Sequence, residues 1–171
     1  MLCSVRSFNR TLSIPFLAVA VLLAASPTLA EDYNFPGLSD TVTVYEDALG
    51  IPTIKGSTYE DVVFVQGYVH ARDRFFQMDY FRKVAQGRLG ELLGSAALPN
   101  DVQLRTLGLS SAALATLQAA DSDLKGIWQA YANGVNAWLA TNSLPPEYIG
   151  LELTEVDPWT VFDTLCYTKL L

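Results

Sequence analysis

The 171-residue sequence has one histidine and two cysteines. A multi-histidine metal site and a disulfide-stapled scaffold are therefore excluded, because each needs several residues of its kind. Basic residues are also scarce: eleven Lys and Arg stand against eighteen Asp and Glu, which gives a net charge of -7. A chain with this charge has no general attraction for phosphates, so we expect no nucleic-acid partner.

Several catalytic and cofactor motifs are absent as well. The sequence has no HExxH, GxSxG, GxGxxG, Walker or CxxC pattern, which removes the common zinc protease, serine hydrolase, nucleotide and dithiol sites that these patterns mark. Cys166 is the only cysteine beyond the first thirty residues. We interpret it as a small buried hydrophobe, with a reactive thiol as the alternative.

The N-terminal thirty residues have the pattern of an export signal. Arg6 and Arg10 precede an almost unbroken apolar run over residues 14–25, and small residues follow up to Ala30. This order predicts a signal peptide over residues 1–30, removed after Ala30. The apolar run of about a dozen residues is shorter than the roughly twenty that span a bilayer, so a retained membrane anchor is the weaker alternative. We therefore expect residues 31–171 to be periplasmic or secreted and free of the membrane.

The rest of the chain predicts an α+β fold that is mostly helical. Residues 41–46 alternate in polarity and residues 51–55 resume an extended pattern, which indicates a β-hairpin. Ser57 and Glu60 form a capping-box pattern before one or two helices over residues 62–81, with Gly67 as the weak point. A short helix at 89–93 should end at Gly94.

The clearest helix is predicted from Asp121 or Ser122 to Leu139, because apolar residues recur there at three- and four-residue spacing. Asp157 and Pro158 then have the pattern of an N-cap and a first helical residue. That last helix is still running at Leu171, which favours a truncated product. We therefore expect large apolar side chains to lack partners within so short a chain, namely Phe75, Phe76, Trp128 and Trp138.

The only histidine, His70, stands three residues before Asp73. On a helix the two would share a face, so an imidazole held by a carboxylate is one interpretation and a purely structural histidine is the other. No nearby residue supplies a nucleophile to that face.

Cations gather in one part of this acidic chain, interleaved with acids and aromatic residues: Arg72, Arg74, Arg82, Lys83, Arg88 and Arg105. They cannot all face water on one helix, so we expect a partly buried ion-pair network. An anion-binding patch is the alternative. Arg74 distinguishes the two, because its neutralisation unfolds the protein only if it is a buried partner.

Five stretches in register strongly resemble the N-terminal part of the α-subunit in the penicillin acylase (penicillin amidase) family. They are DALGIPTI at 47–54, GYVHARDRFFQMD at 67–79, GRLGELLG at 87–94, YANGVNA at 131–137 and PWTVFD at 158–163. By this resemblance, nine positions belong to the structural family motif: His70, Arg72, Asp73, Arg74, Gln77, Arg88, Glu91, Asp101 and Arg105. Four of them, Asp73, Arg74, Gln77 and Glu91, would lie near a subunit interface.

The resemblance implies an exported precursor that cuts itself into an α-subunit and a β-subunit, within the four-layer αββα sandwich of N-terminal-nucleophile hydrolases. The nucleophile would be the N-terminal Ser of the β-subunit, with its own α-amine as base. The reaction would be amide hydrolysis through an acyl-enzyme, on penicillins, related amides or N-acyl-homoserine lactones. Calcium is common in one branch of the family, so a full-length protein is a candidate for binding it.

The resemblance assigns no catalytic, substrate-binding or metal residue to this chain, because the pocket and calcium positions lie just beyond the one that matches Leu171. We therefore expect residues 31–171 to be an inactive piece with no cofactor, whose partner is the β-subunit of the same precursor and whose substrate binds only the assembled enzyme. The alternative is a non-catalytic exported relic or binding protein that retains this fold.

Overall fold

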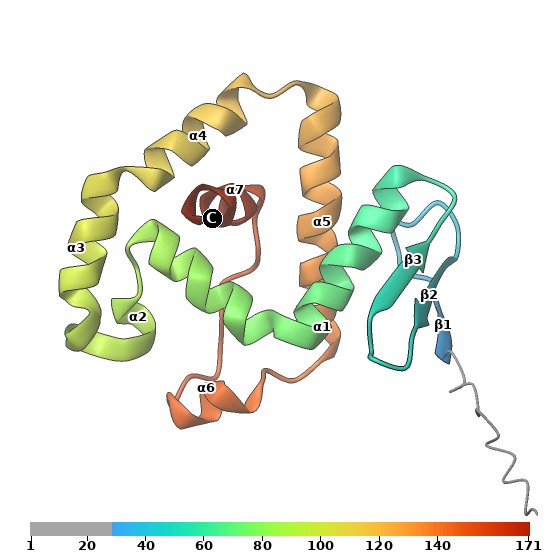
Figure 1. The fold of residues 1–171 in the computed structure, drawn as a ribbon, viewed down its shortest axis with the longest axis horizontal. Helices are drawn as coiled ribbons and strands as arrows, with labels where there is room; N and C mark the ends of the chain where they lie inside the picture. Colours follow the sequence, from blue (N-terminus) through green and yellow to red (C-terminus); the bar gives the residue numbers. More distant parts are fainter. Residues whose placement is uncertain (1–28) are drawn as a thin grey trace, which may run out of the picture.

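A computed structural model describes residues 29–171, which are mostly helical with one small antiparallel sheet (Figure 1). This confirms the predicted α+β class. In chain order the elements are β1 (Leu29–Tyr33), β2 (Val42–Glu46), β3 (Pro52–Lys55), α1 (Tyr59–Gln86), α2 (Gly90–Leu93), a 3-10 turn (Gly94–Ala97), α3 (Leu98–Leu107), α4 (Leu109–Ala119), α5 (Ser122–Thr141), α6 (Pro146–Gly150) and α7 (Val161–Leu170).

The sheet has the order β1-β2-β3. The predicted hairpin is present as β2 and β3, and β1 is a third strand that the sequence patterns did not indicate. Ala30 pairs with Tyr45, so the predicted cleavage site lies inside β1. Cleavage there would leave residues 31–33 paired with β2. Residues 1–28, which carry nearly all of the predicted signal, lie outside the described part of the chain.

Helix α1 begins one residue later than the capping-box pattern indicated. The N-cap is Thr58, whose hydroxyl accepts a hydrogen bond from the Asp61 amide at 3.1 Å. The Ser57 hydroxyl instead donates to Asp40 at 3.1 Å. The assignment of Ser57 as the cap was therefore wrong.

One helix spans the region where one or two were predicted, and it bends at Arg74 and not at Gly67. Arg74 has non-helical dihedrals, φ -146° and ψ 25°, within an otherwise continuous helix. Gly67 instead lies where α1 crosses α5: a Cβ there would clash with the Tyr131 carbonyl, and a Cβ at Gly134 would clash with the Phe64 carbonyl. The two glycines let the helix backbones approach closely.

Helix α5 confirms the predicted amphipathic helix, with Asp121 as its N-cap and Asn142 as its C-cap. The short α2 likewise ends at Gly94 as predicted. Helices α3 and α4 were not predicted. Helix α7 starts at Val161, because Thr160 and Asp163 form a complete capping box, so the start proposed at Asp157 and Pro158 was wrong.

Three apolar clusters fill the interior. One lies between the sheet and the first half of α1, one around Phe75, Trp138, Tyr148 and Trp159, and one between α4 and α7 around Cys166. The expectation that large aromatic residues lack partners was wrong: Phe75 and Trp138 are buried, and Phe76 and Trp128 are half-buried against the clusters. The fully buried Cys166 confirms its interpretation as a small hydrophobe, and burial raises the pKa of its thiol.

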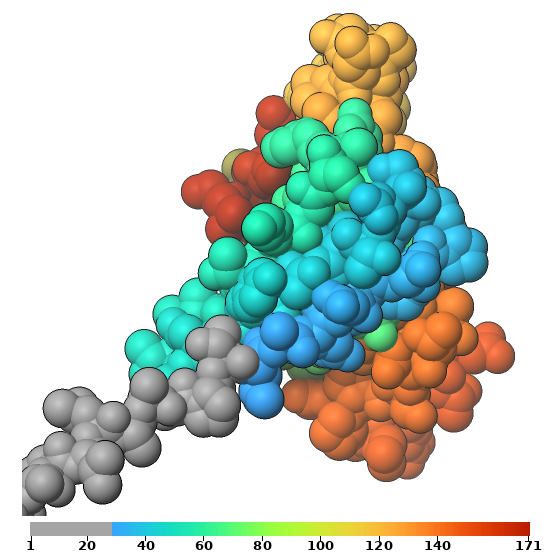
Figure 2. Space-filling model, turned by 90° about the vertical axis from the view of Figure 1, so that its right-hand side faces the viewer, coloured from blue at the N-terminus to red at the C-terminus, as the bar shows by residue number. Residues whose placement is uncertain are grey.

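Helix α1 runs through the middle of the molecule, with the sheet at its N-terminal end and α7 inside an arc formed by α3, α4 and α5 (Figure 1). Figure 2 views the sheet end, where the strand residues (blue and cyan) face the reader in front of α1. Within residues 29–171, no helix is both long and apolar enough to cross a membrane. The apolar run at 14–25 lies outside this range.

Candidate functional site

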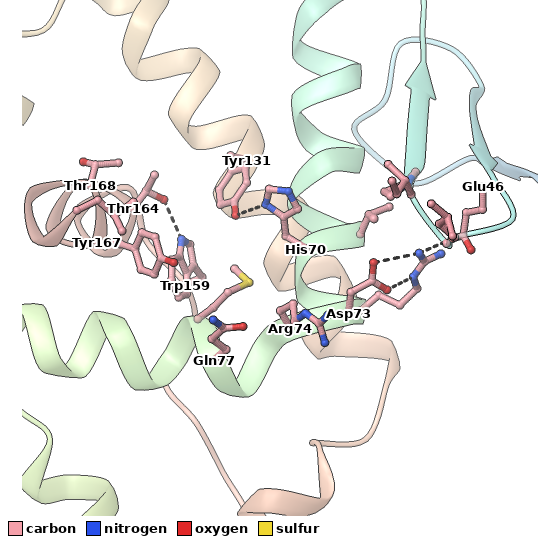
Figure 3. A pocket seen from close by; sticks show the side chains of 18 residues that line it. Glu46, His70, Asp73, Arg74, Gln77, Tyr131, Trp159, Thr164, Tyr167 and Thr168 are labelled. Atoms are coloured by element: carbon pink, nitrogen blue, oxygen red, sulfur yellow. Dashed lines mark hydrogen bonds and ion pairs between the residues drawn. The ribbon is translucent and has the colours of Figure 1, made fainter.

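An open cleft of about 890 Å³ lies at the bend of α1. Its walls are the turn between β2 and β3, the bend itself, Tyr131 of α5 and the outer face of α7 (Figure 3). The cleft thus joins segments from both ends of the chain.

Among the residues of α1 that line the cleft are His70, Asp73, Arg74 and Gln77. Their spacing of three and four residues places them on one helical face. The bend at Arg74 lies in the middle of this group, so the two halves of α1 present their side chains from different directions (Figure 3).

His70 is paired with Tyr131 and not with Asp73. Its Nδ1 lies 2.9 Å from the Tyr131 hydroxyl, and the two rings meet edge to face. Burial raises the pKa of Tyr131 to about 12, and desolvation by the surrounding protein lowers the pKa of His70. At neutral pH both side chains are therefore uncharged, and the tautomer of the imidazole decides which of the two donates the hydrogen bond.

Asp73 is bound to its neighbour Arg72 instead, at 2.8 Å from the guanidinium Nε. No Asp73–His70 hydrogen bond forms in the described residues, and neither does one between His70 and a Ser or Thr hydroxyl. The arrangement of an imidazole held by a carboxylate is therefore not built. Within residues 29–171 the geometry matches the structural interpretation of His70.

Arg72 ties α1 to the sheet. Besides Asp73 it donates to Glu46 of β2 and, at 3.2 Å, to the Tyr33 hydroxyl of β1. The hydrogen bond to Asp73, followed by that to Glu46, outweighs partial burial and raises the pKa of Arg72. Burial, and then a hydrogen bond to Glu31, raises the pKa of Tyr33 to about 12.

Arg74 differs from the expectation of a buried ion pair. It is exposed in the cleft, and no carboxylate in residues 29–171 lies within ion-pair distance of it. Gln77, one turn further along, is exposed too, and its side chain has no hydrogen-bond partner in the same range. The cleft therefore presents one cation and one side-chain amide that have no partner among the described residues.

The buried ionic cluster lies one to two turns beyond the bend, around Arg82. This side chain is 2% exposed and contacts Asp79, which is fully buried, at 2.6 Å. It also donates to the backbone carbonyls of Asp157 at 2.8 Å and Pro158 at 3.1 Å, and its guanidinium lies over the Trp159 ring at 5.1 Å.

Three further side chains complete this network, and sequence patterns alone did not identify them. Tyr148 donates to Asp79 at 2.7 Å, and Gln86 donates to Asp163 at 2.6 Å. Asp163 in turn lies 3.4 Å from Arg82 and caps α7. The only sequence signal for Asp163 was its place in the PWTVFD stretch.

A second group of ion pairs lies nearer the surface. Arg88 contacts Glu91 at 2.6 Å and Asp157 at 2.8 Å, and Lys83 contacts Glu91 at 2.8 Å. Partial burial pushes the pKa of Glu91 upward, but the hydrogen bonds from Arg88 and Lys83 outweigh it, so the pKa is lower than usual. These pairs fix the turn after α1.

Asp101 and Arg105 secure the same turn from α3. The Asp101 carboxylate accepts hydrogen bonds from the amides of Leu89 and Gly90 at 2.7 and 2.8 Å. Arg105 donates to the Gly87 carbonyl at 2.8 Å. Both residues therefore bind backbone groups, which the spacing of charges alone did not predict.

Asn136 of α5 joins two of the recognised stretches. It accepts from the Trp159 amide at 2.7 Å and donates to the Trp159 carbonyl at 2.8 Å. Within residues 29–171, no group of three or more His, Cys, Asp or Glu side chains is placed to hold a metal ion. The described geometry thus holds segments together and presents a cleft, and it supplies no nucleophile with an activating base.

Comparison with known proteins agrees with the resemblance in the sequence. The family model described as penicillin amidase matches residues 41–171. Penicillin acylase 2 proenzyme from Pseudomonas sp. strain SE83 is 40% identical over 151 residues, which cover 88% of this chain and 19% of that protein. The acyl-homoserine lactone acylase QuiP of Pseudomonas aeruginosa is 44% identical over 103 residues, 60% of this chain and 12% of that protein.

The fold is similar to that of a solved acylase. A thermostable penicillin G acylase from Alcaligenes faecalis superposes with a TM-score of 0.67 at 29% identity, covering 74% of this chain and 69% of that chain. Against the two Pseudomonas proteins, the chain spans a fifth or less of their length, 19% and 12%.

Proposed function

The chain belongs to the penicillin amidase family, and from that premise we propose that residues 31–171 form the N-terminal part of an exported amidohydrolase that cleaves the amide bond of N-acyl compounds. The observation that carries the proposal is the family match over residues 41–171, together with the similar fold of a penicillin G acylase.

The role of this chain in such an enzyme is that of a scaffold. Three of the family-like stretches, 67–79, 131–137 and 158–163, meet through Asn136, Trp159 and the Arg82 network. Buried, fully hydrogen-bonded contacts of this kind fix one arrangement of helices. They would hold α1, α5 and α7 in the orientation that the catalytic part of the protein packs against.

The chemistry would come from a second subunit of the same precursor. By the family resemblance, the hydroxyl of an N-terminal Ser attacks the amide carbonyl and its α-amine takes the hydroxyl proton. The α-ammonium then passes this proton to the amide nitrogen, the C–N bond breaks, and the amine product leaves. Water then hydrolyses the acyl-enzyme ester. The groups described in residues 29–171 take no part in these steps, so the chain alone should not hydrolyse amides.

The family resemblance suggests a calcium ion, but the described residues do not offer a site for one. They place no three carboxylates together, whereas calcium binds six to eight oxygen ligands.

The substrates belong to one of two classes. Penicillin is in the names of two similar proteins and acyl-homoserine lactone is in the name of another. Both classes offer an acyl amide to the same nucleophile. The cleft described in this chain does not distinguish the two classes, because by the family resemblance the acyl pocket is formed by residues beyond the position that matches Leu171.

A chimeric precursor tests the proposal. Residues 31–171 would replace the matching stretch of the Pseudomonas sp. SE83 proenzyme, and the purified product would be assayed with penicillin G and with an N-acyl-homoserine lactone. We expect amine release from at least one substrate by the chimera and none by the 171-residue chain alone. A folded chimera without activity on either substrate would contradict the proposal and favour the non-catalytic alternative.

A further inference from the structure

The cleft at the bend of α1 has features of a docking surface that is formed before its partner arrives. The turn between β2 and β3 forms one lip, and its apolar side chains project outward: Leu49 is 83% exposed and Ile51 is 57% exposed. The Asp47 carboxylate accepts hydrogen bonds from the amides of Leu49 and Ile51 at 2.8 and 2.9 Å. The two apolar side chains are therefore held on an ordered turn, which lowers the entropic cost of covering them.

The wall of the cleft formed by α1 has a positive charge that no carboxylate of the described residues neutralises. The acidic side chains that line the same cleft, Glu46 and Asp73, are both bound by Arg72. Arg74 is left in the same cleft without a carboxylate from residues 29–171, although acids outnumber bases in the whole sequence by eighteen to eleven. Arginine binds carboxylates through two parallel hydrogen bonds, and Gln77 adds an unpaired amide one turn away.

The relatives indicate where a partner would come from. The stretch that matches this chain makes up only 19% of the Pseudomonas sp. SE83 proenzyme. In such a relative, most of the protein lies outside the stretch that matches this chain and is available to pack against it. An apolar lip beside an unpaired cation suits an apolar segment that carries one carboxylate.

We propose that this cleft docks an apolar segment with a single Asp or Glu from the remaining part of the same precursor, and that Arg74 is the residue that binds its carboxylate. The inference rests on the proposed function. Arg74 is a positioning residue for assembly in this account, and it does not touch the substrate.

The experiment uses the chimeric precursor in four forms: parent, Arg74→Gln, Arg74→Lys and the control Lys55→Gln. Lys55 is an exposed cation on β3 that lies outside the cleft and has no ion pair within residues 29–171. The measurements are the yield of the assembled protein by size exclusion, its dissociation at low and high salt, and KM for penicillin G and for an N-acyl-homoserine lactone.

We expect Arg74→Gln to weaken assembly at least about tenfold, Arg74→Lys to have an intermediate effect, and Lys55→Gln to assemble like the parent. The defect of Arg74→Gln should shrink at high salt, where the parent also loses its ion pair. In an Arg74→Glu background, changing one acidic residue of the partner to Arg should restore assembly and thereby identify the carboxylate.

Other outcomes overturn the inference. If Arg74→Gln assembles like the parent, or if no acidic position restores Arg74→Glu, the cleft does not dock such a segment. If Arg74→Gln raises KM only for penicillin G, which carries a carboxylate, Arg74 binds substrate instead. If the unsubstituted chimera is active and either of these results is found, only the inference is rejected. If the unsubstituted chimera folds but is inactive, the proposed function is rejected, and the inference with it.

Discussion

Arg74 and Arg82 lie eight residues apart on the same helix, yet their surroundings are opposite. Arg82 is 2% exposed and contacts two carboxylates, two carbonyls and an aromatic ring. Arg74 is exposed in an open cleft and pairs with none of the described residues. A buried charge requires partners within the fold, whereas an exposed charge is available to a partner outside it. Arg82 therefore stabilises the fold, whereas Arg74 belongs to an exposed surface.

The largest effect should come from Arg82→Met. This change leaves Asp79 and Asp163 buried without their cation, and removal of one partner from a buried ion pair typically costs about 3 to 5 kcal/mol. We expect either insoluble protein or a free energy of unfolding, measured by urea titration, that is lower by that amount. Urea is preferred over guanidinium because it does not screen ion pairs. A loss below about 1 kcal/mol would remove the contrast between the two arginines.

Tyr148→Phe should have the next largest effect. It removes only the hydroxyl that donates to Asp79 at 2.7 Å and retains the ring that packs on Phe75 and Phe76. One oxygen of a buried carboxylate then lacks its donor, at a cost of about 1 to 3 kcal/mol. The matched control in the cleft is Tyr131→Phe, which removes the hydrogen bond to His70 and should cost less in the same urea titration.

The pH dependence of stability should distinguish the cleft from the network. The pKa of His70 is lowered by desolvation in the folded state, so the unfolded chain binds the proton more readily. The contribution of His70 to stability is then complete above its unfolded pKa of about 6.5 and is lost as pH falls below it. Between pH 7.5 and 5.5, the parent should lose more stability than His70→Gln, as measured by thermal melts. Parallel curves for the two proteins would contradict this prediction.

Arg74→Gln should have the smallest effect on the fold. Surface substitutions away from buried contacts usually change stability by no more than about 0.5 kcal/mol. In the 171-residue chain without the rest of a precursor, we expect the urea curve of Arg74→Gln to overlay that of the unsubstituted chain. A cooperative loss comparable to that of Arg82→Met would show that Arg74 has a partner within the chain and that the cleft is not an open surface.

Elements with strong local patterns could be predicted from the sequence. The alternation of residues 41–46, the three-four spacing in α5 and Gly94 after α2 each led to the observed element. Helices α3 and α4 were not predicted, and several of their apolar residues, among them Leu98, Val102 and Leu107, are exposed. A helix whose apolar residues do not form one buried face has no clear period to detect.

The start of α7 was misplaced for a different reason. Asp157–Pro158 and Thr160–Asp163 are both plausible helix starts by local chemistry. In the structure the Asp157 carboxylate binds Arg88, and its backbone carbonyl accepts from Arg82. These tertiary contacts hold residue 157 outside the helix and leave the capping role to Thr160.

Composition, local periodicity and five short stretches were enough to indicate an α+β fold and the penicillin amidase family, because both depend on residues close together in the chain. They also indicated that some of the clustered charges had to be paired. Which arginine is paired depends on Tyr148, Asp157 and Asp163, each of which lies 69 to 81 residues from the Asp79 or Arg82 side chain that it contacts. Only the packing of α6 and α7 against α1 brings these groups together, and the same packing, with the bend at Arg74, leaves the other arginine in the open cleft.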